Sequence, residues 1–183
     1  MRPLITPAAM RNMERRYFAE TGTPSIQLME RAARALCESI LRRYGRKARV
    51  WFACGPGGNG GDGYACARLL AERGCECALF PSEPPRSPDA AENRRRARAA
   101  GVPDLDPDRA KGAPEVWVDA LYGTGLSRAP QGRAAALIQR MNADRARGSA
   151  VVAVDIPSGL DGKTGEARRP CVHADVTCCF QFA

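Results

Sequence analysis

The chain has 183 residues, of which 44% are hydrophobic and 26% are charged, and its formal net charge is +8. A chain of this length buries about 70% of its unfolded surface as one domain, so it needs no disulfide or structural metal to fold. Its eight cysteines include no Cys-x-x-Cys pair, which disfavours a zinc ribbon or a thioredoxin-type site. Because it has no run of eighteen apolar residues and no signal-peptide core, we expect a cytoplasmic protein without a membrane partner.

Arginine supplies nearly all of the positive charge, since only three of the 28 basic residues are lysines. The basic runs Arg42-Arg43 and Arg94-Arg95-Arg96 fall in segments with helical character. They lack the interleaved aromatic residues on which single-strand nucleic-acid binders stack bases. We therefore expect solvated basic faces and no specific nucleic-acid partner.

Two helices are predicted before the first strand. Thr6-Pro7 forms an N-cap and first-turn pair, and Gly22 ends the helix that this pair begins. Ser25 is expected to cap the second helix, which ends at Gly45. Apolar residues at helical spacing are expected to form the core face of the second helix: Ile26, Met29, Ala33, Leu36, Cys37 and Ile40.

From Val50 onward, short apolar runs alternate with helical segments. We predict strands at 50–54, 75–80, 116–121, 150–154 and 175–180, and helices near 62–73, 88–100 and 132–143. This alternation is typical of an α/β fold with a parallel sheet. The predicted fold is a Rossmann-like three-layer α/β/α sandwich with a mostly parallel, doubly wound sheet and two N-terminal helices.

Residues 55–63 read Gly-Pro-Gly-Gly-Asn-Gly-Gly-Asp-Gly and join the first predicted strand to a helix. Six glycines in nine residues let backbone N–H groups approach an anion and permit positive φ angles. The following helix adds the positive end of its dipole. Gly55-x-Gly57-x-x-Gly60 satisfies the dinucleotide fingerprint, which is a weak signal alone. No Lys-Ser/Thr pair follows, so the segment predicts a phosphate-binding loop outside the P-loop NTPases.

Polar residues follow two further predicted strands. Asp119 precedes a second glycine-rich turn at 122–126, and Asp155 precedes an Ile-Pro-Ser158-Gly turn. Open α/β sheets bind ligands at the carboxyl ends of their strands, so these residues are expected to share one crevice with the glycine segment. A single aspartate at such a position is often structural, but three polar strand ends together favour a binding site.

These residues resemble the NAD(P)H-hydrate epimerase family, known as the YjeF amino-terminal domain. The resemblance runs over nearly the whole chain: Leu4-Ile5-Thr6-Pro7, Asn59-Gly60-Gly61-Asp62-Gly63, Asp119-x-x-x-Gly123-Thr124-Gly125-Leu126 and Asp155-Ile156-Pro157-Ser158-Gly159. It implies an isomerase that interconverts the R and S forms of hydrated NADH or NADPH at nicotinamide C6. An ADP- or ATP-dependent NAD(P)H-hydrate dehydratase specific for the S form would then complete the repair of both forms.

The resemblance has further implications for the chain as a whole. Residues 1–183 are expected to form one YjeF amino-terminal domain, and family members continue beyond the position of Ala183. A homodimer is also implied. Gly58 stands where family members often carry Asn, which removes one side-chain amide from the expected site.

The resemblance also assigns ligands to individual residues. The hydrated nucleotide is expected to contact Asp155 and two backbone segments: Gly58, Asn59, Gly60, Gly61 and Asp62, and Gly123, Thr124, Gly125, Leu126, Ser127, Arg128 and Ala129. A potassium ion (K+) is expected at Asn59, Asp119 and Ser158. Amide, carboxylate and hydroxyl oxygens are ligands that suit a hard cation.

The substrate carbon C6 bears both the ring nitrogen and a hydroxyl group, so its inversion requires no abstraction of a carbon-bound proton. Loss and return of water and opening of the ring both remain open as routes. One acid/base suffices in either route, and we assign this role to Asp155, since a positioned group contributes about 10²–10⁴ in rate. Two alternatives remain: a non-catalytic nucleotide-binding scaffold, and an NAD(P)-dependent oxidoreductase in which Glu83 binds the ribose.

Overall fold

The computed structural model describes residues 6–180, so Leu4 and Ile5 lie outside the described residues. Its helices are Pro7–Thr21 (α1), Ser25–Tyr44 (α2), Gly58–Ala71 (α3), Pro88–Ala99 (α4) and Gly132–Arg145 (α5). Its strands are Arg49–Cys54 (β1), Glu76–Pro81 (β2), Val116–Ala120 (β3), Ala150–Val154 (β4) and Val176–Cys178 (β5). The strands form one sheet in the order β2-β1-β3-β4-β5, and all neighbouring pairs are parallel.

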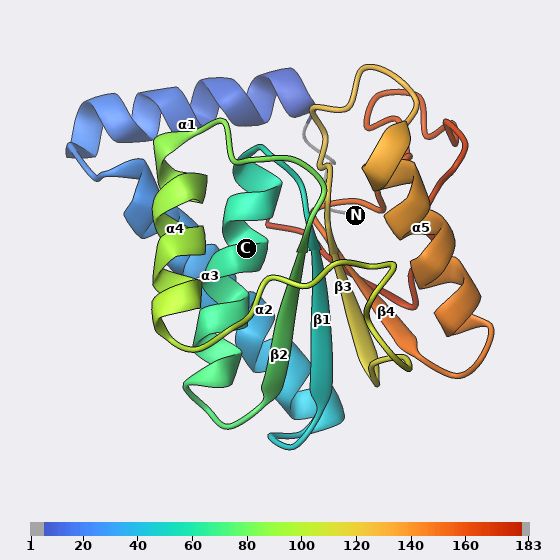
Figure 1. Cartoon of the computed structure of the whole chain (residues 1–183). Coiled ribbons are helices and arrows are strands. Elements are labelled where there is room, and N and C mark those ends of the chain that lie inside the picture. The colour runs from blue at the N-terminus through green and yellow to red at the C-terminus, as the bar shows by residue number, and fades with distance from the viewer. Residues whose placement is uncertain (1–5, 181–183) are drawn as a thin grey trace.

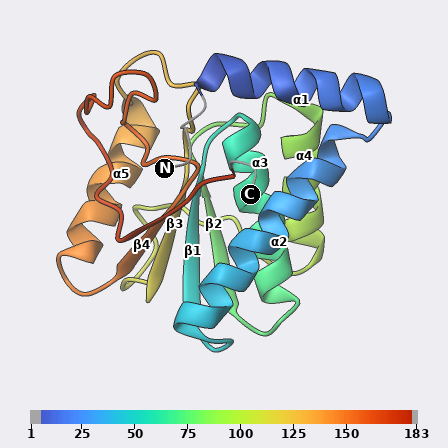
Figure 2. The ribbon, with the colours of Figure 1, turned by 180° about the vertical axis from the view of Figure 1, so that it is seen from behind.

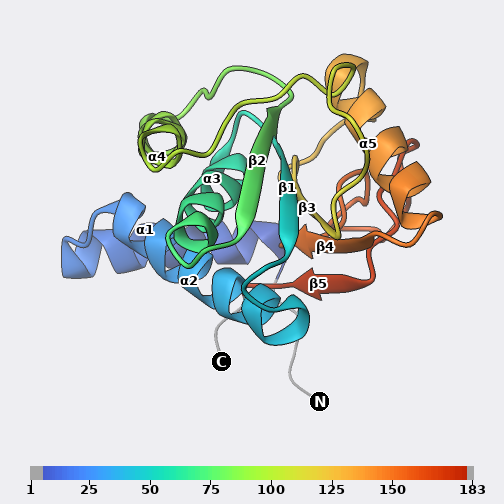
Figure 3. The ribbon, with the colours of Figure 1, turned by 60° about the horizontal axis from the view of Figure 1, so that its bottom comes forward.

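Side chains of the sheet alternate between two apolar cores. Val50 and Phe52 of β1 belong to the core shared with α2 and α3, whereas Trp51 belongs to the core shared with α5. Figure 3 shows the sheet between α2 and α3 on one side and α5 on the other. The predicted three-layer sandwich with a parallel sheet is therefore confirmed.

Helix α2 provides most of the core face that its periodicity predicts. Ala33, Leu36, Cys37 and Ile40 are buried, whereas Ile26 and Met29 at the start of the helix are only partly buried. Figure 2 shows the helix crossing one face of the sheet. All eight cysteines are free thiols, and five of them are buried, in agreement with a reduced apolar core.

An aromatic cluster stabilises the opposite face. Trp51, Phe80 and Trp117 come from three adjacent strands, and their ring centroids lie 4.9–5.3 Å apart. The indole N–H of Trp117 donates to Asp144 Oδ2 of α5 over 3.0 Å, so the buried polar atom of this ring has a partner.

The predicted cap of α2 is wrong. Pro24 is the N-cap residue, with φ −61° and ψ 139°, and Ser25 is the first residue of the helix. The Ser25 hydroxyl donates to Asp89 Oδ2 at the start of α4 and makes no cap hydrogen bond. A contact between two helices has thus replaced the local capping bond.

The glycine segment also differs from its prediction. Helix α3 begins at Gly58 rather than near residue 62, so Gly60, Gly61 and Gly63 are helical. No glycine between 55 and 63 has a positive φ angle, although this residue type permits one. Instead, a Cβ at Gly61 would lie 2.6 Å from Met29 Sδ, and one at Gly63 would lie 2.6 Å from the Ala120 Cβ. These glycines allow α3 to pack closely against its neighbours.

The chain reverses direction across the sheet between β1 and β3. The connection through α3 leads from β1 outward to β2, whereas α5 connects β3 to β4 in the opposite direction. The carboxyl ends of β1 and β3 are thus the point at which open α/β sheets bind ligands. Figure 1 shows α1 lying across this end of the sheet.

The last strand is shorter than predicted, with Val176–Cys178 in place of 175–180. In the part of the chain from residue 6 to residue 180, no helix combines the length and the apolar character that crossing a bilayer requires.

Candidate functional site

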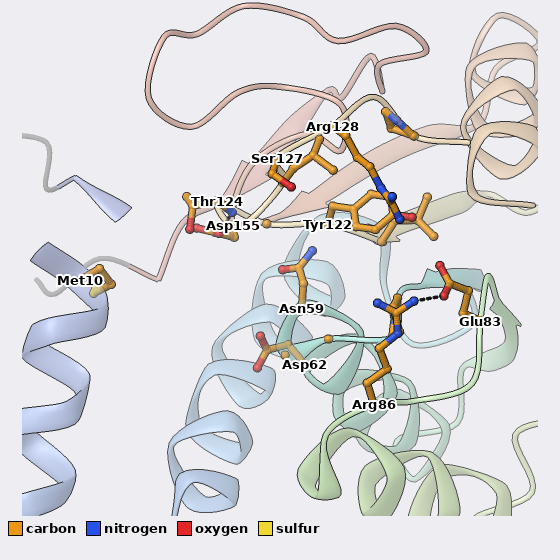
Figure 4. A pocket seen from close by; sticks show the side chains of 18 of the residues that line it. Met10, Asn59, Asp62, Glu83, Arg86, Tyr122, Thr124, Ser127, Arg128 and Asp155 are labelled. Atoms are coloured by element: carbon orange, nitrogen blue, oxygen red, sulfur yellow. Dashed lines mark hydrogen bonds and ion pairs between the residues drawn. The ribbon is translucent and has the colours of Figure 1, made fainter. Parts of the chain in front are cut away.

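A pocket of about 700 Å³ lies at the carboxyl ends of β1 and β3. Its lining includes three segments that each follow a strand and are far apart in the sequence: the start of α3, the turn after β3 and the end of β4. Figure 4 shows Asn59, Thr124 and Asp155 facing this space from those segments. The predicted convergence of three strand ends on one crevice is therefore present in the structure.

The N-terminus of α3 forms one wall of the pocket. Gly57 is its N-cap residue and provides no side-chain cap, so the first N–H groups have neither an intrahelical nor a side-chain partner. Gly58 and Asn59 line the pocket at this point. Free N–H groups together with the helix dipole favour an anion such as a phosphate.

Two of the predicted nucleotide contacts lie behind this wall. Gly60 and Gly61 are buried and do not line the pocket. The Gly61 N–H donates to the Gly57 carbonyl over 3.1 Å, so its backbone serves the helix. The other predicted contacts line the pocket: Gly58, Asn59, Asp62, Gly123, Thr124, Gly125, Leu126, Ser127, Arg128, Ala129 and Asp155.

Asp155 is held in an unusual conformation beside the turn after β3. It is the one non-glycine residue with positive φ among those described, at 68°. Its backbone N–H donates to the Cys178 carbonyl over 2.9 Å, and its Oδ2 accepts from the Thr124 N–H over 2.8 Å. A left-handed conformation is costly for a residue with a Cβ and is concentrated at functional sites.

Gly123 is required for this arrangement. A Cβ at position 123 would meet the Asp155 carboxyl group, with its Cγ at 3.3 Å. The absence of a side chain lets the backbone of the turn approach the carboxylate closely enough for the Thr124 hydrogen bond.

A second carboxylate faces the same end of the pocket. Asp62 projects from the second turn of α3, and burial raises its pKa well above the ordinary value, with Asp155 and Glu14 adding to the rise. Figure 4 shows Asp62 on the pocket wall across from Asp155. Two carboxyl groups, one of them with a raised pKa, therefore face the same end of the pocket.

Asp119 and Ser158 lie beneath the pocket. Both are buried, and neither lines the pocket. Asp119 Oδ2 accepts from the Ser158 N–H over 2.7 Å, and its Oδ1 accepts from the Ser158 hydroxyl over 2.6 Å and the Leu121 N–H over 3.2 Å. Burial raises the pKa of Asp119 to about 6, against the lowering effect of these bonds.

The same hydrogen bonds fix the turn after β3. Ser158 Oγ accepts from the Tyr122 N–H over 2.9 Å and so connects Asp119 to the pocket wall. Asn59 contributes a side-chain amide whose Nδ2 is buried and has no hydrogen-bond partner among the residues from 6 to 180. Among the described residues, no three His, Cys, Asp or Glu side chains gather into a metal site.

Several pocket residues were not assigned to it from the sequence. Met10 and Glu14 come from α1, Arg86 from the loop after β2, and Phe180 from the segment after β5. Arg86 follows the end of β2. The expectation that ligands bind at the carboxyl ends of strands could therefore have included it, as it included Glu83 of the same loop. The helix α1 gave no such signal, because its place across the sheet depends on tertiary packing.

Comparison with known proteins gives consistent matches. The family described as YjeF-related protein N-terminus matches residues 25–183. A protein named NAD(P)H-hydrate epimerase from Limosilactobacillus fermentum is 35% identical, over 97% of this chain and 85% of that protein. A homologue with the same name from Limosilactobacillus reuteri is 32% identical, over 98% of this chain and 84% of that protein.

Longer relatives and one solved structure match as well. A bifunctional NAD(P)H-hydrate repair enzyme Nnr from Moorella thermoacetica is 37% identical over 97% of this chain, which spans 36% of that enzyme. The crystal structure of the yeast protein YNL200c matches with a TM-score of 0.85 and 21% identity, over 96% of this chain and 79% of that one. The yeast structure supports the fold.

Proposed function

This chain belongs to the YjeF-related protein N-terminus family, and on this premise we propose that it epimerises hydrated NADH and NADPH at nicotinamide C6. The chain is then an isomerase in the repair of damaged nicotinamide nucleotides. The observation that carries the proposal is the Asp155 carboxylate, held at φ 68° in the pocket that the free N-terminus of α3 also lines. A hydrated nucleotide has a group for each of these two features: its C6 hydroxyl suits the carboxylate, and its pyrophosphate suits the helix N-terminus.

The pyrophosphate of the substrate binds at the start of α3. Gly58 and Asn59 offer backbone N–H groups without intrahelical partners, and the helix dipole favours the negative charge. Thr124 and Gly125 bring a second stretch of backbone to the opposite wall. This placement directs the hydrated nicotinamide ring toward Asp155 and Asp62.

Asp155 moves the proton at the C6 hydroxyl oxygen. If water leaves, the oxygen takes up a proton as the C6–O bond breaks, and it releases a proton when water returns on the other face. If the ring opens, Asp155 takes the hydroxyl proton as the bond between C6 and the ring nitrogen breaks, and the nitrogen keeps the electron pair of that bond and receives a proton. Closure on the other face reverses both transfers. Either route needs one positioned acid/base, and Asp62, whose pKa burial raises, lies within electrostatic range of Asp155.

The buried carboxylate of Asp119 supports a potassium site. Asp119 forms no ion pair with any residue from 6 to 180, although it is fully buried. Ser158 supplies a neutral oxygen in contact with its one formal charge, and the Asn59 amide would add a second, a donor set that suits a hard monovalent cation. The bound ion would neutralise Asp119 and thereby stabilise the turn that Ser158 connects to it.

The product of this reaction serves a second enzyme. We assign the functional partner as an ADP- or ATP-dependent NAD(P)H-hydrate dehydratase that consumes the S form. The relatives named bifunctional repair enzymes support this assignment, because this chain matches about one third of their length.

The decisive experiment supplies the pure R hydrate and follows the S form by chromatography, with spontaneous epimerisation subtracted. We expect the purified chain to accelerate the conversion, and to do so faster in KCl than in tetramethylammonium chloride of equal ionic strength. Binding of the hydrate without conversion would favour the scaffold function, and oxidation of NADH with a small carbonyl would favour the oxidoreductase. Either result would overturn the proposal.

A further inference from the structure

The two ends of the pocket carry opposite chemistry. One end holds the carboxyl groups of Asp62, Asp155 and Glu14, and the last two lie within electrostatic range of Asp62. The other end holds two guanidinium groups, those of Arg86 and Arg128. Figure 4 shows Asp62 and Asp155 toward one side of the view, and Arg86 and Arg128 toward the other.

The basic end is built from two chain segments. Arg86 comes from the loop after β2 and forms an ion pair with Glu83, whereas Arg128 comes from the turn after β3. Tyr122 lies within electrostatic range of all three charges: burial and Glu83 raise its pKa, and Arg128 and Arg86 lower it. Arg128 forms no ion pair with another described residue, so this end carries a net positive charge.

The α3 N-terminus lies between these two ends, and this position determines the orientation in which the substrate binds. If the nicotinamide ring lies at the carboxylates and the pyrophosphate lies at Gly58 and Asn59, the adenosine ribose reaches the arginines. The first strand pair of a dinucleotide fold commonly reads the ribose 2′ position, where a carboxylate binds a hydroxyl and an arginine binds a phosphate. Here the carboxylate of Glu83 is already paired with Arg86.

We propose that Arg86 and Arg128 bind the 2′-phosphate of the substrate, so that this chain prefers hydrated NADPH over hydrated NADH. The inference rests on the proposed function for the identity of the reaction, and on the two guanidinium groups for the selectivity. A phosphate between two arginines forms charge-assisted hydrogen bonds, which are stronger than neutral ones. The same phosphate repels the carboxylate of Glu83, so the charge of Glu83 reduces the preference for hydrated NADPH over hydrated NADH.

The test compares both hydrates in the wild type and in three variants. We expect the ratio of kcat/KM for hydrated NADPH to that for hydrated NADH to fall about tenfold in Arg86→Ala. Glu83→Gln should raise this ratio, since it removes the negative charge and keeps a polar side chain. Arg133→Ala is the matched control, because this exposed arginine lies outside the pocket.

Ionic strength provides an independent measurement. The preference should decline as choline chloride is added at constant potassium, because salt screens partly exposed charges. A wild type that turns over both hydrates equally well, or an Arg86→Ala variant with an unchanged ratio, would overturn the inference.

Failure of the selectivity can be distinguished from failure of the proposed function. NADP+ and NAD+ serve as stable probes, and their binding is measured by calorimetry without any turnover. Tighter binding of NADP+ that is lost in Arg86→Ala would support the arginine site even if neither hydrate were epimerised. Equal binding of the two probes would count against the site, whatever the epimerase activity.

Discussion

The buried carboxylate of Asp119 makes a quantitative prediction about stability and pH. Its pKa rises from 3.8 to about 6 in the folded chain, chiefly through burial. The folded state therefore holds the Asp119 proton more tightly than the unfolded state does. Its contribution to the free energy of unfolding is complete below about pH 4 and is lost as the pH rises through about 6, a loss of about 3 kcal/mol.

The assay is urea unfolding of the wild type and of Asp119→Asn at a series of pH values in tetramethylammonium chloride. The variant does not titrate at this position, so the difference between the two proteins removes other titrating groups such as Glu92, whose pKa is lowered to about 2. We expect the wild type to lose about 3 kcal/mol relative to the variant between about pH 3 and about pH 8. A difference that stays constant with pH would refute the burial argument.

Potassium tests the second half of the reasoning. An ion bound to the Asp119 carboxylate stabilises the charged form and lowers its pKa in the folded state. The free energy of unfolding that the wild type loses as the pH rises should therefore be smaller in KCl than in tetramethylammonium chloride of equal ionic strength. The Asp119→Asn variant should show no such difference between the two salts. Equal losses in both salts would contradict the potassium site while leaving the burial effect intact.

Two further substitutions test the site and its framework. Asp155→Asn should bind the hydrated nucleotide within about tenfold, or about 1.4 kcal/mol, but epimerise it at least about a hundredfold more slowly by chromatography. Near-normal turnover would shift the acid/base role to Asp62. Gly63→Ala should lower the free energy of unfolding by about 1–3 kcal/mol, because its Cβ would lie 2.6 Å from the Ala120 Cβ. Gly58→Ala, where a Cβ meets nothing within 4 Å, is the control, and equal urea midpoints for the two variants would contradict the packing role.

The sheet could be predicted because its signal is carried by composition. Strands such as Val116–Ala120 are buried along their whole length, so they appear in the sequence as short apolar runs between helical segments. The strand order then places Asp119 and the glycine segment at adjacent strand ends. Pattern and topology were therefore sufficient to bring the correct segments to one pocket.

The internal geometry of these segments could not be predicted in the same way. Six glycines have low helix propensity and indicated a loop, yet α3 begins at Gly58 because its packing outweighs propensity. The Ser25 hydroxyl could form a capping hydrogen bond within α2 or a hydrogen bond with Asp89. It bonds with Asp89 because α4 packs close to the start of α2. Such choices depend on neighbours that are distant in sequence.

The resemblance implies a potassium site that includes Asp119, but the sequence gave no indication that this residue lies below the pocket surface. Its burial follows from its register in β3, where Asp119 pairs with Ala53 on one side and Ala153 on the other. Small neighbours leave room for the backbone of residue 158 to approach and donate. The depth of a polar side chain is thus set by the adjoining strands.

The conformation of Asp155 connects stability to function in this site. Its positive φ costs about 1–2 kcal/mol relative to an ordinary conformation, and glycine would avoid that cost. The conformation persists because the Cys178 carbonyl accepts from its backbone and the Thr124 N–H binds its carboxylate. That N–H belongs to the turn that lines the pocket, so a hydrogen bond holds the Asp155 side chain and this turn together. Under the proposed function, the cost of this conformation is explained by the chemistry of the Asp155 carboxylate, which the left-handed backbone holds against the turn that lines the pocket.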